Sequence, residues 1–196
     1  MNINFKELLS VIAIIITFVA FIPYVRSIYI GKTKPHVFSW VIWGLATFIV
    51  FLAQLADDGG AGTWAIGISG IISLLIAIFA YYKRADISIT KSDWIFFVLA
   101  LSAIPFWYIT SNPLWAVIIL TSVDTVGYLP TIRKSYLKPF EEQLLLYILI
   151  AIRNIIAAIA LEHYSVTTLL FPVTISLTCI IFTAIVVYRR KTSKEL

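Results

Sequence analysis

Apolar runs of about twenty residues recur along the whole chain, and they constrain its fold more than any other feature. A helix of that length crosses a hydrocarbon core of about 30 Å. Seven such runs are predicted to span a membrane: 8–28, 36–56, 63–82, 94–110, 113–137, 143–161 and 166–188. The composition agrees, since 61% of the residues are hydrophobic and 13% are charged, against about 45–50% and about 25% in soluble domains. The chain is therefore predicted to be an all-α integral membrane protein.

Basic residues indicate which helix ends face the cytoplasm, where short loops carry an excess of lysine and arginine. Thirteen of the fifteen lie on one side of the predicted bundle: Arg26, Lys32, Lys34, Lys83, Arg84, Lys91, Arg133, Lys134, Lys138, Arg189, Arg190, Lys191 and Lys194. Lys6 lies on the other side. The net charge of +5 therefore follows from topology and does not indicate a nucleic-acid partner. The predicted location is the cell membrane, with the N-terminus outside and the C-terminus in the cytoplasm.

Two pairs of short segments indicate an internal duplication. The segment FIPYVRSIY (21–29) aligns with YLPTIRKSY (128–136) at an offset of 107 residues, which matches Pro23 with Pro130. The segment YKR (82–84) aligns with YRR (188–190) at an offset of 106 residues. Spans one to three and five to seven are therefore predicted to form two parallel three-helix repeats, 1–84 and 113–196. The fourth span, within 85–112, is the linker that inverts the chain between them.

This 3+1+3 arrangement, with a proline toward the cytoplasmic end of the first helix of each half, resembles the SWEET and PQ-loop group of transporters. The proline–glutamine signature of that group is replaced by Pro23-Tyr24 and Pro130-Thr131. The resemblance implies that Pro23 and Pro130 are paired gating hinges. A passive kink is the alternative, because an interior proline lacks the N–H that a helix needs. Vitamin-precursor carriers of similar helix count are another group that the chain resembles.

Asp124 and Arg153 are ionisable residues near the middle of the fifth and sixth predicted spans. Asp124 precedes Pro139 by 15 residues and Arg153 follows it by 14, so both lie about 21–23 Å of helix from the turn. A charge at that depth costs at least about 2.5–3.5 kcal/mol unless it is paired or hydrated. The two residues are therefore predicted to lie within reach of each other. They form a salt bridge between the two helices, or a substrate-binding or proton-coupling site in a central cavity, and the two can coexist because a substrate can compete for either partner.

Three polar residues extend this candidate site. Asn154 follows Arg153 and points about 100° further around the helix, where its amide can bind a polar solute or contact another helix. Under the offset of 107 residues, Asp124 corresponds to Thr17 and Asn154 corresponds to Thr47. The site is therefore predicted to carry its charges in the second half only.

Trp40 and Trp43 lie three residues apart and share one face of the second predicted span. Trp40 lies nearer the cytoplasmic end and is expected in the aromatic belt at the membrane boundary. Trp43 lies deeper, and two interpretations are open: a second belt residue or a stacking wall of the substrate site.

These features favour a transporter that moves a small polar or charged solute by alternating access, with proton coupling at Asp124 as a further hypothesis. The alternative is a seven-helix receptor-like protein that binds a ligand without moving it. An enzyme is not expected, because neither a Ser/His/Asp nor an HExxH arrangement is present. His36, His163 and the single Cys179 lie far apart, so no metal or cofactor is expected. The predicted partners are a small-molecule solute and the lipid bilayer, and homo-oligomerisation stays open.

Overall fold

The computed structural model describes residues 4–31, 35–83, 87, 89, 91–137, 139–141 and 144–192. Within this part the chain forms seven α-helices and no β-strand. The helices are α1 (Phe5–Tyr29), α2 (Val37–Ala56), α3 (Trp64–Tyr82), α4 (Lys91–Thr110), α5 (Leu114–Leu137), α6 (Leu144–Ala160) and α7 (Val166–Thr192). Two short 3-10 helices, η1 (Gly60–Thr63) and η2 (Pro139–Glu141), precede α3 and α6.

Five segments of this part are helical, long and apolar enough to cross a membrane: α1, α2, η1 with α3, α4 and α7. The apolar stretches of α5 and α6, Leu114–Tyr128 and Leu144–Ala160, are shorter. Large apolar side chains also cover the outside of the bundle; Ile22, Leu75 and Ile181 are 61%, 57% and 57% exposed. Extended apolar surfaces of this kind are unfavourable in water and suit a lipid environment. The prediction of an all-helical membrane protein is therefore confirmed, with five helices long and apolar enough to cross a membrane in the described part.

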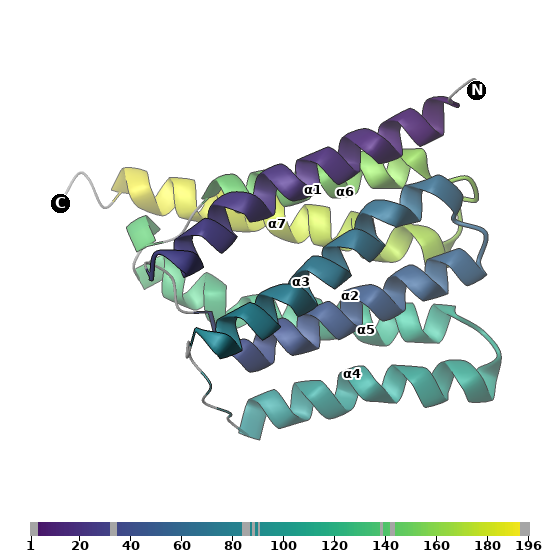
Figure 1. The fold of residues 1–196 in the computed structure, drawn as a ribbon, viewed down its shortest axis with the longest axis horizontal. Helices are drawn as coiled ribbons and strands as arrows, with labels where there is room; N and C mark the ends of the chain where they lie inside the picture. Colours follow the sequence, from purple (N-terminus) through teal and green to yellow (C-terminus); the bar gives the residue numbers. More distant parts are fainter. Residues whose placement is uncertain are drawn as a thin grey trace.

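The helices run side by side in one bundle, and the two ends of the chain lie at opposite ends of it (Figure 1). In the first set of three, α3 packs against both α1 and α2; in the last set, α7 packs against both α5 and α6. The two sets meet through contacts of α1 with α6 and of α2 with α5. Helix α4 lies at the edge, against α5 and part of α2. The third helix of each set therefore lies between the first two.

Glycines allow close approach where these helices meet. A Cβ atom added to Gly70 of α3 would lie 2.9 Å from the backbone nitrogen of Phe48 in α2. One added to Gly62 would lie 2.5 Å from the backbone nitrogen of Leu161. Small residues of this kind let helix backbones pack closely in membrane proteins. The two contacts hold α3 against α2 and η1 against the end of α6.

Candidate functional site

Asp124 is a carboxylate buried inside the bundle. It is 7% exposed and lies ten residues after the start of α5, which is about 15 Å along the helix. Among the described residues, its Oδ1 atom has no hydrogen-bond partner, and neither does Oγ1 of Thr121. Thr121 precedes Asp124 by three residues and therefore shares its face of the helix. This face of α5 thus presents unpaired polar atoms to the interior of an apolar bundle.

Arg153 is the buried basic residue of the described part. Its side chain is 4% exposed, and it lies seven residues before the end of α6, about 10 Å from the bundle end at which α5 begins. Nη1 donates a hydrogen bond of 3.2 Å to the carbonyl oxygen of Ala65 in α3. The Nε–H group has no partner. Arg153 therefore connects α6 to α3 while one of its donors is unused.

Asp124 and Arg153 do not form a direct ion pair. Within the described residues, no nitrogen–oxygen contact of 4.0 Å or less joins them. The reason is the helix order, because α7 packs between α5 and α6. The two side chains nevertheless attract each other electrostatically. The two opposite charges thus lie at similar depths in the bundle without touching. Each side chain keeps a polar atom without a partner among the described residues, Oδ1 of Asp124 and Nε of Arg153.

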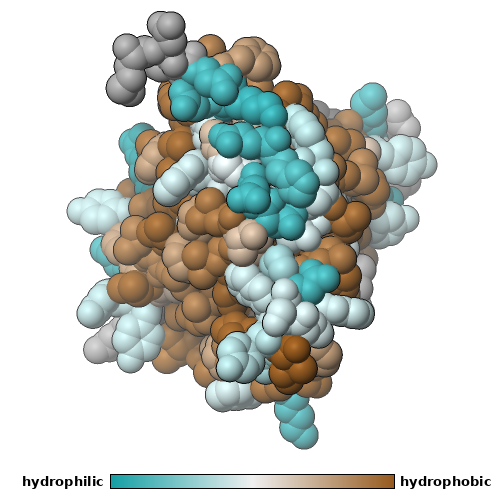
Figure 2. All heavy atoms as spheres, turned by 90° about the vertical axis from the view of Figure 1, so that its right-hand side faces the viewer, coloured by the Kyte–Doolittle hydropathy of each residue, from teal (hydrophilic) through white to brown (hydrophobic). Residues whose placement is uncertain are grey.

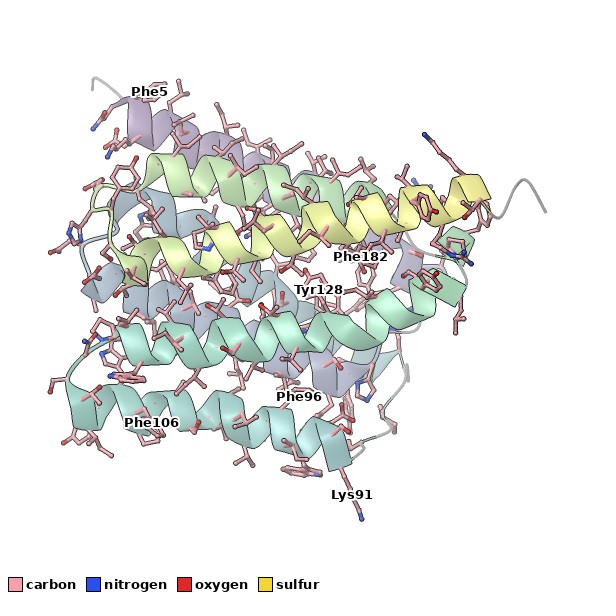
Figure 3. All side chains as sticks on the ribbon, turned by 180° about the vertical axis from the view of Figure 1, so that it is seen from behind. Phe5, Lys91, Phe96, Phe106, Tyr128 and Phe182 are labelled. Atoms are coloured by element: carbon pink, nitrogen blue, oxygen red, sulfur yellow. The ribbon has the colours of Figure 1, made fainter. Side chains whose placement is uncertain are left out.

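Tyr128 and Cys179 also belong to this site, and neither is among the residues predicted from the sequence. The Tyr128 hydroxyl lies 3.4 Å from Sγ of Cys179 in α7, and both groups lie near Asp124 and Arg153. Tyr128 and Phe182 lie between α5 and α7 (Figure 3). The spacing of four residues from Asp124 was the available signal for Tyr128. Cys179 sits in an apolar run, and no sequence signal distinguishes it.

Trp43 lies against the same face of α5. A Cβ atom on Gly127 would be 3.2 Å from Nε1 of Trp43, and Gly127 follows Asp124 by three residues. Trp43 therefore lies about one helical turn from Asp124 along this face, and its role as a stacking wall stays a prediction. Trp40 is 8% exposed and packs against Tyr24 and Trp43, with ring centroids 5.1 and 5.7 Å away. The expectation that Trp40 belongs to the boundary belt is wrong, because neighbouring aromatic rings bury it.

Asn154 and the two threonines are buried, but no hydrogen bond in the described part joins them to Asp124. Asn154 donates from Nδ2 to the Ile150 carbonyl at 2.9 Å, and its Oδ1 atom has no partner. Thr17 donates to the Ala13 carbonyl of its own helix at 2.8 Å, and Thr47 is 7% exposed. The substrate-binding role of these three residues stays a prediction.

A cluster of alanines places Thr17 and Asn154 at one level of the bundle. Ala13, Ala65 and Ala157 pack together from α1, α3 and α6. Thr17 follows Ala13 by four residues and Asn154 precedes Ala157 by three, so both lie one helical turn below this cluster. Arg153 lies one turn below it as well. The structure thus brings Thr17, Asn154 and Arg153 to the same level.

The two prolines proposed as hinges lie within helices. Helix α1 continues through Pro23 for six residues, to Tyr29. Helix α5 continues through position 130 to Leu137, and the side chain of Pro130 lies outside the described part. The role of the pair in gating stays a prediction.

Hydrogen bonds close the end of the bundle at which α1 begins. They connect residues 57–63, between α2 and α3, with residues 161–165, between α6 and α7; we call this set the interloop network. Ser165 Oγ donates to Asp57 Oδ2, and His163 Nδ1 lies 3.0 Å from the Asp57 carbonyl oxygen. Glu162 accepts from the Ala61 amide at 3.2 Å. Figure 2 looks onto this end and shows hydrophilic residues gathered over part of it, flanked by apolar ones.

Nearby side chains extend the interloop network below the surface. Lys6 donates to the Leu161 carbonyl and lies over the Tyr164 ring, 5.0 Å from its centroid. Gln54 Nε2 donates to the Thr168 carbonyl at 2.6 Å. These contacts join the first three helices to the last two at this end.

Within the described residues, no group of three or more His, Cys, Asp or Glu side chains could hold a metal ion. The polar atoms of the site are those of Asp124, Arg153, Tyr128 and Thr121, with the Trp43 indole beside them. Such a set can bind charged and hydrogen-bonding groups of a small solute. Comparison with models of known protein families, with curated proteins and with solved structures finds no match for the chain.

Proposed function

We propose that this protein is a membrane transporter that moves a small polar or charged solute by alternating access. The observation that carries the proposal is the buried pair Asp124 and Arg153, which are out of contact and keep unpaired polar atoms. Ionisable residues inside a membrane are costly and commonly mark a solute or ion pathway. A purely structural pair would be in contact and mutually satisfied.

The helix packing supports two parallel repeats, 1–84 and 113–196, joined by a linker in 85–112. Each set of three has the same order, with its third helix between the first and the second. The contacts between the sets are reciprocal: α1 with α6, and α2 with α5. A pseudo-two-fold axis along the membrane normal generates this pattern, and in transporters the solute site lies between the two repeats.

The interloop network supports an alternating mechanism. It ties the two proposed repeats together at the end of the bundle where α1 begins, which the distribution of basic residues assigns to the outside of the cell membrane. Opening this end would require the bonds of Asp57, Glu162 and Ser165 to break. Solvent-exposed polar bonds contribute modestly to stability, so they suit a contact that must form and break.

Uptake into proteoliposomes tests the proposal. The purified chain is reconstituted and screened with labelled amino acids, sugars, nucleosides and vitamins, with and without a pH gradient. We expect saturable uptake of at least one class above that of empty liposomes. Stimulation by the gradient would support proton coupling at Asp124. Binding of a solute without uptake would favour the receptor-like alternative and contradict the transporter.

The topology is testable separately. A reporter fused to the C-terminus is expected to be cytoplasmic, and one fused to the N-terminus is expected to be external, because seven spans place the termini on opposite sides. A fluorescent protein that folds only in the cytoplasm and a phosphatase that is active only outside distinguish the two locations. Both termini on one side would contradict the seven-span topology and the parallel repeats together.

A further inference from the structure

We infer that the solute is a small zwitterion, with its cationic group bound at Asp124 and its anionic group at Arg153. The inference rests on the proposed function and names the substrate class of the same site. Two opposite charges are buried 93% and 96%, since Asp124 and Arg153 are 7% and 4% exposed. Within the described residues they do not contact each other.

The anionic end of the ligand fits Arg153. The Nε–H donor of this side chain has no partner, and its Nη1 bond to the Ala65 carbonyl is a neutral contact of 3.2 Å. A carboxylate binds a guanidinium through shorter and stronger charge-assisted bonds. A ligand carboxylate would therefore satisfy Nε and compete with Ala65 for the guanidinium. Ala65 belongs to α3 and Arg153 to α6, so this competition weakens a contact between the two proposed repeats.

The cationic end of the ligand fits the corner formed by Asp124, Trp43 and Tyr128. Asp124 Oδ1 is an unpaired acceptor, and the Trp43 indole lies against Gly127, on the same face of α5. An ammonium group is attracted both to a carboxylate and to the face of an indole ring. A ligand with only a cation would leave Arg153 unpaired, and one with only an anion would leave Asp124 unpaired. A zwitterion satisfies both.

A neutral solute explains the site less well. Hydrogen bonds from hydroxyl groups would not neutralise two buried charges that are out of contact. The helix order keeps the two charges apart, because α7 packs between α5 and α6. The separation of the two charges is therefore a property of the fold, and a molecule that carries both charges would have to pair with each of them around α7.

Charge-selective binding tests the inference on the full chain in detergent. The probes are the twenty common L-amino acids and glycine betaine, followed by two derivatives of the best amino acid: its methyl ester, which is a cation, and its N-acetyl form, which is an anion. Glucose is the neutral probe. Thermal stabilisation gives the ranking, and titration calorimetry gives the dissociation constant. We expect the zwitterion to bind at least about 30-fold more tightly than either derivative, because each derivative leaves one buried charge unpaired.

Variants show which residue binds each charged group of the ligand. Arg153→Gln should remove the preference for the zwitterion over the methyl ester, and Asp124→Asn should remove the preference for the zwitterion over the N-acetyl form. A purely structural role would lower all affinities together. Arg153→Lys and Asp124→Glu keep the charges and should keep the selectivity, which covers the case that a neutral variant fails to fold. Asp58→Asn, at an exposed position, should change nothing.

The inference is overturned if glucose or either derivative binds the unaltered protein as tightly as the zwitterion, or if no zwitterion of the panel binds. Uptake of a neutral solute would uphold the transporter and overturn the zwitterion. Binding of the zwitterion without uptake would uphold the zwitterion as the ligand and contradict the transporter. The two proposals therefore fail in different measurements.

Discussion

Replacing Asp124 with asparagine is expected to lower solute uptake by at least about 30-fold without lowering the melting temperature. Asparagine has nearly the same shape, so its packing inside the bundle is preserved. Among the described residues, the carboxylate has no hydrogen bond or ion pair that the change would remove. Breaking a buried pair in contact costs about 3–5 kcal/mol, and the part of the chain that the structure describes holds no such pair at Asp124. The substitution removes a buried charge that has no contact partner among the described residues, whereas a solute that binds the carboxylate would lose its partner.

Initial uptake rates in proteoliposomes and thermal unfolding in detergent measure the two effects. Asp58→Asn is the matched control, because it removes the same charge from an exposed position with a backbone φ of 55°, which asparagine tolerates. A structural salt bridge predicts the opposite pattern. In that case Asp124→Asn and Arg153→Gln would each lower the melting temperature, and exchanging the two residues would restore it. Full uptake together with unchanged stability would contradict both interpretations.

The helices could be predicted from the sequence because long apolar runs between polar turns are typical of helices that cross a membrane. The seven apolar runs match α1 to α7 to within a few residues at most ends. The differences lie in polar turns that hydropathy does not detect. Helix α1 begins at Phe5 rather than residue 8, because Asn4 and Glu7 form a capping box. Helix α4 begins at Lys91 and α7 extends to Thr192.

The level of the site residues along the bundle could be predicted from the sequence, but which of them are in contact could not. Counting residues from a turn gives the level of a side chain, so Asp124 and Arg153 were expected at similar depths, and the structure places them so. Which helices are neighbours is not encoded in chain order. The direct salt bridge assumed that the fifth and sixth helices pack together, whereas α7 lies between them. The contributions of Tyr128 and Cys179 depend on that helix order and could not be found without it.

A disulfide between positions 57 and 165 is expected to stop transport until it is reduced. Ser165 Oγ donates to Asp57 Oδ2, so the two side chains meet across the connections α2–α3 and α6–α7. The variant Asp57→Cys with Ser165→Cys replaces a bond that can open with a covalent one. If this end of the bundle must open in every cycle, the oxidised protein should show only the uptake of empty liposomes, and a reducing agent should restore the uptake.

The native Cys179 is 0% exposed, so it can stay in place while the introduced thiols are oxidised. Each single variant, treated with the same oxidant, is the matched control and should retain its uptake. Mass spectrometry of the digested protein confirms the cross-link, and ligand binding measured on the oxidised protein shows that the site is intact. Uptake that persists in fully cross-linked protein would mean that the interloop network never opens. The alternating motion would then have to be sought elsewhere in the bundle, whereas a reversible block places one of its two gates at Asp57 and Ser165.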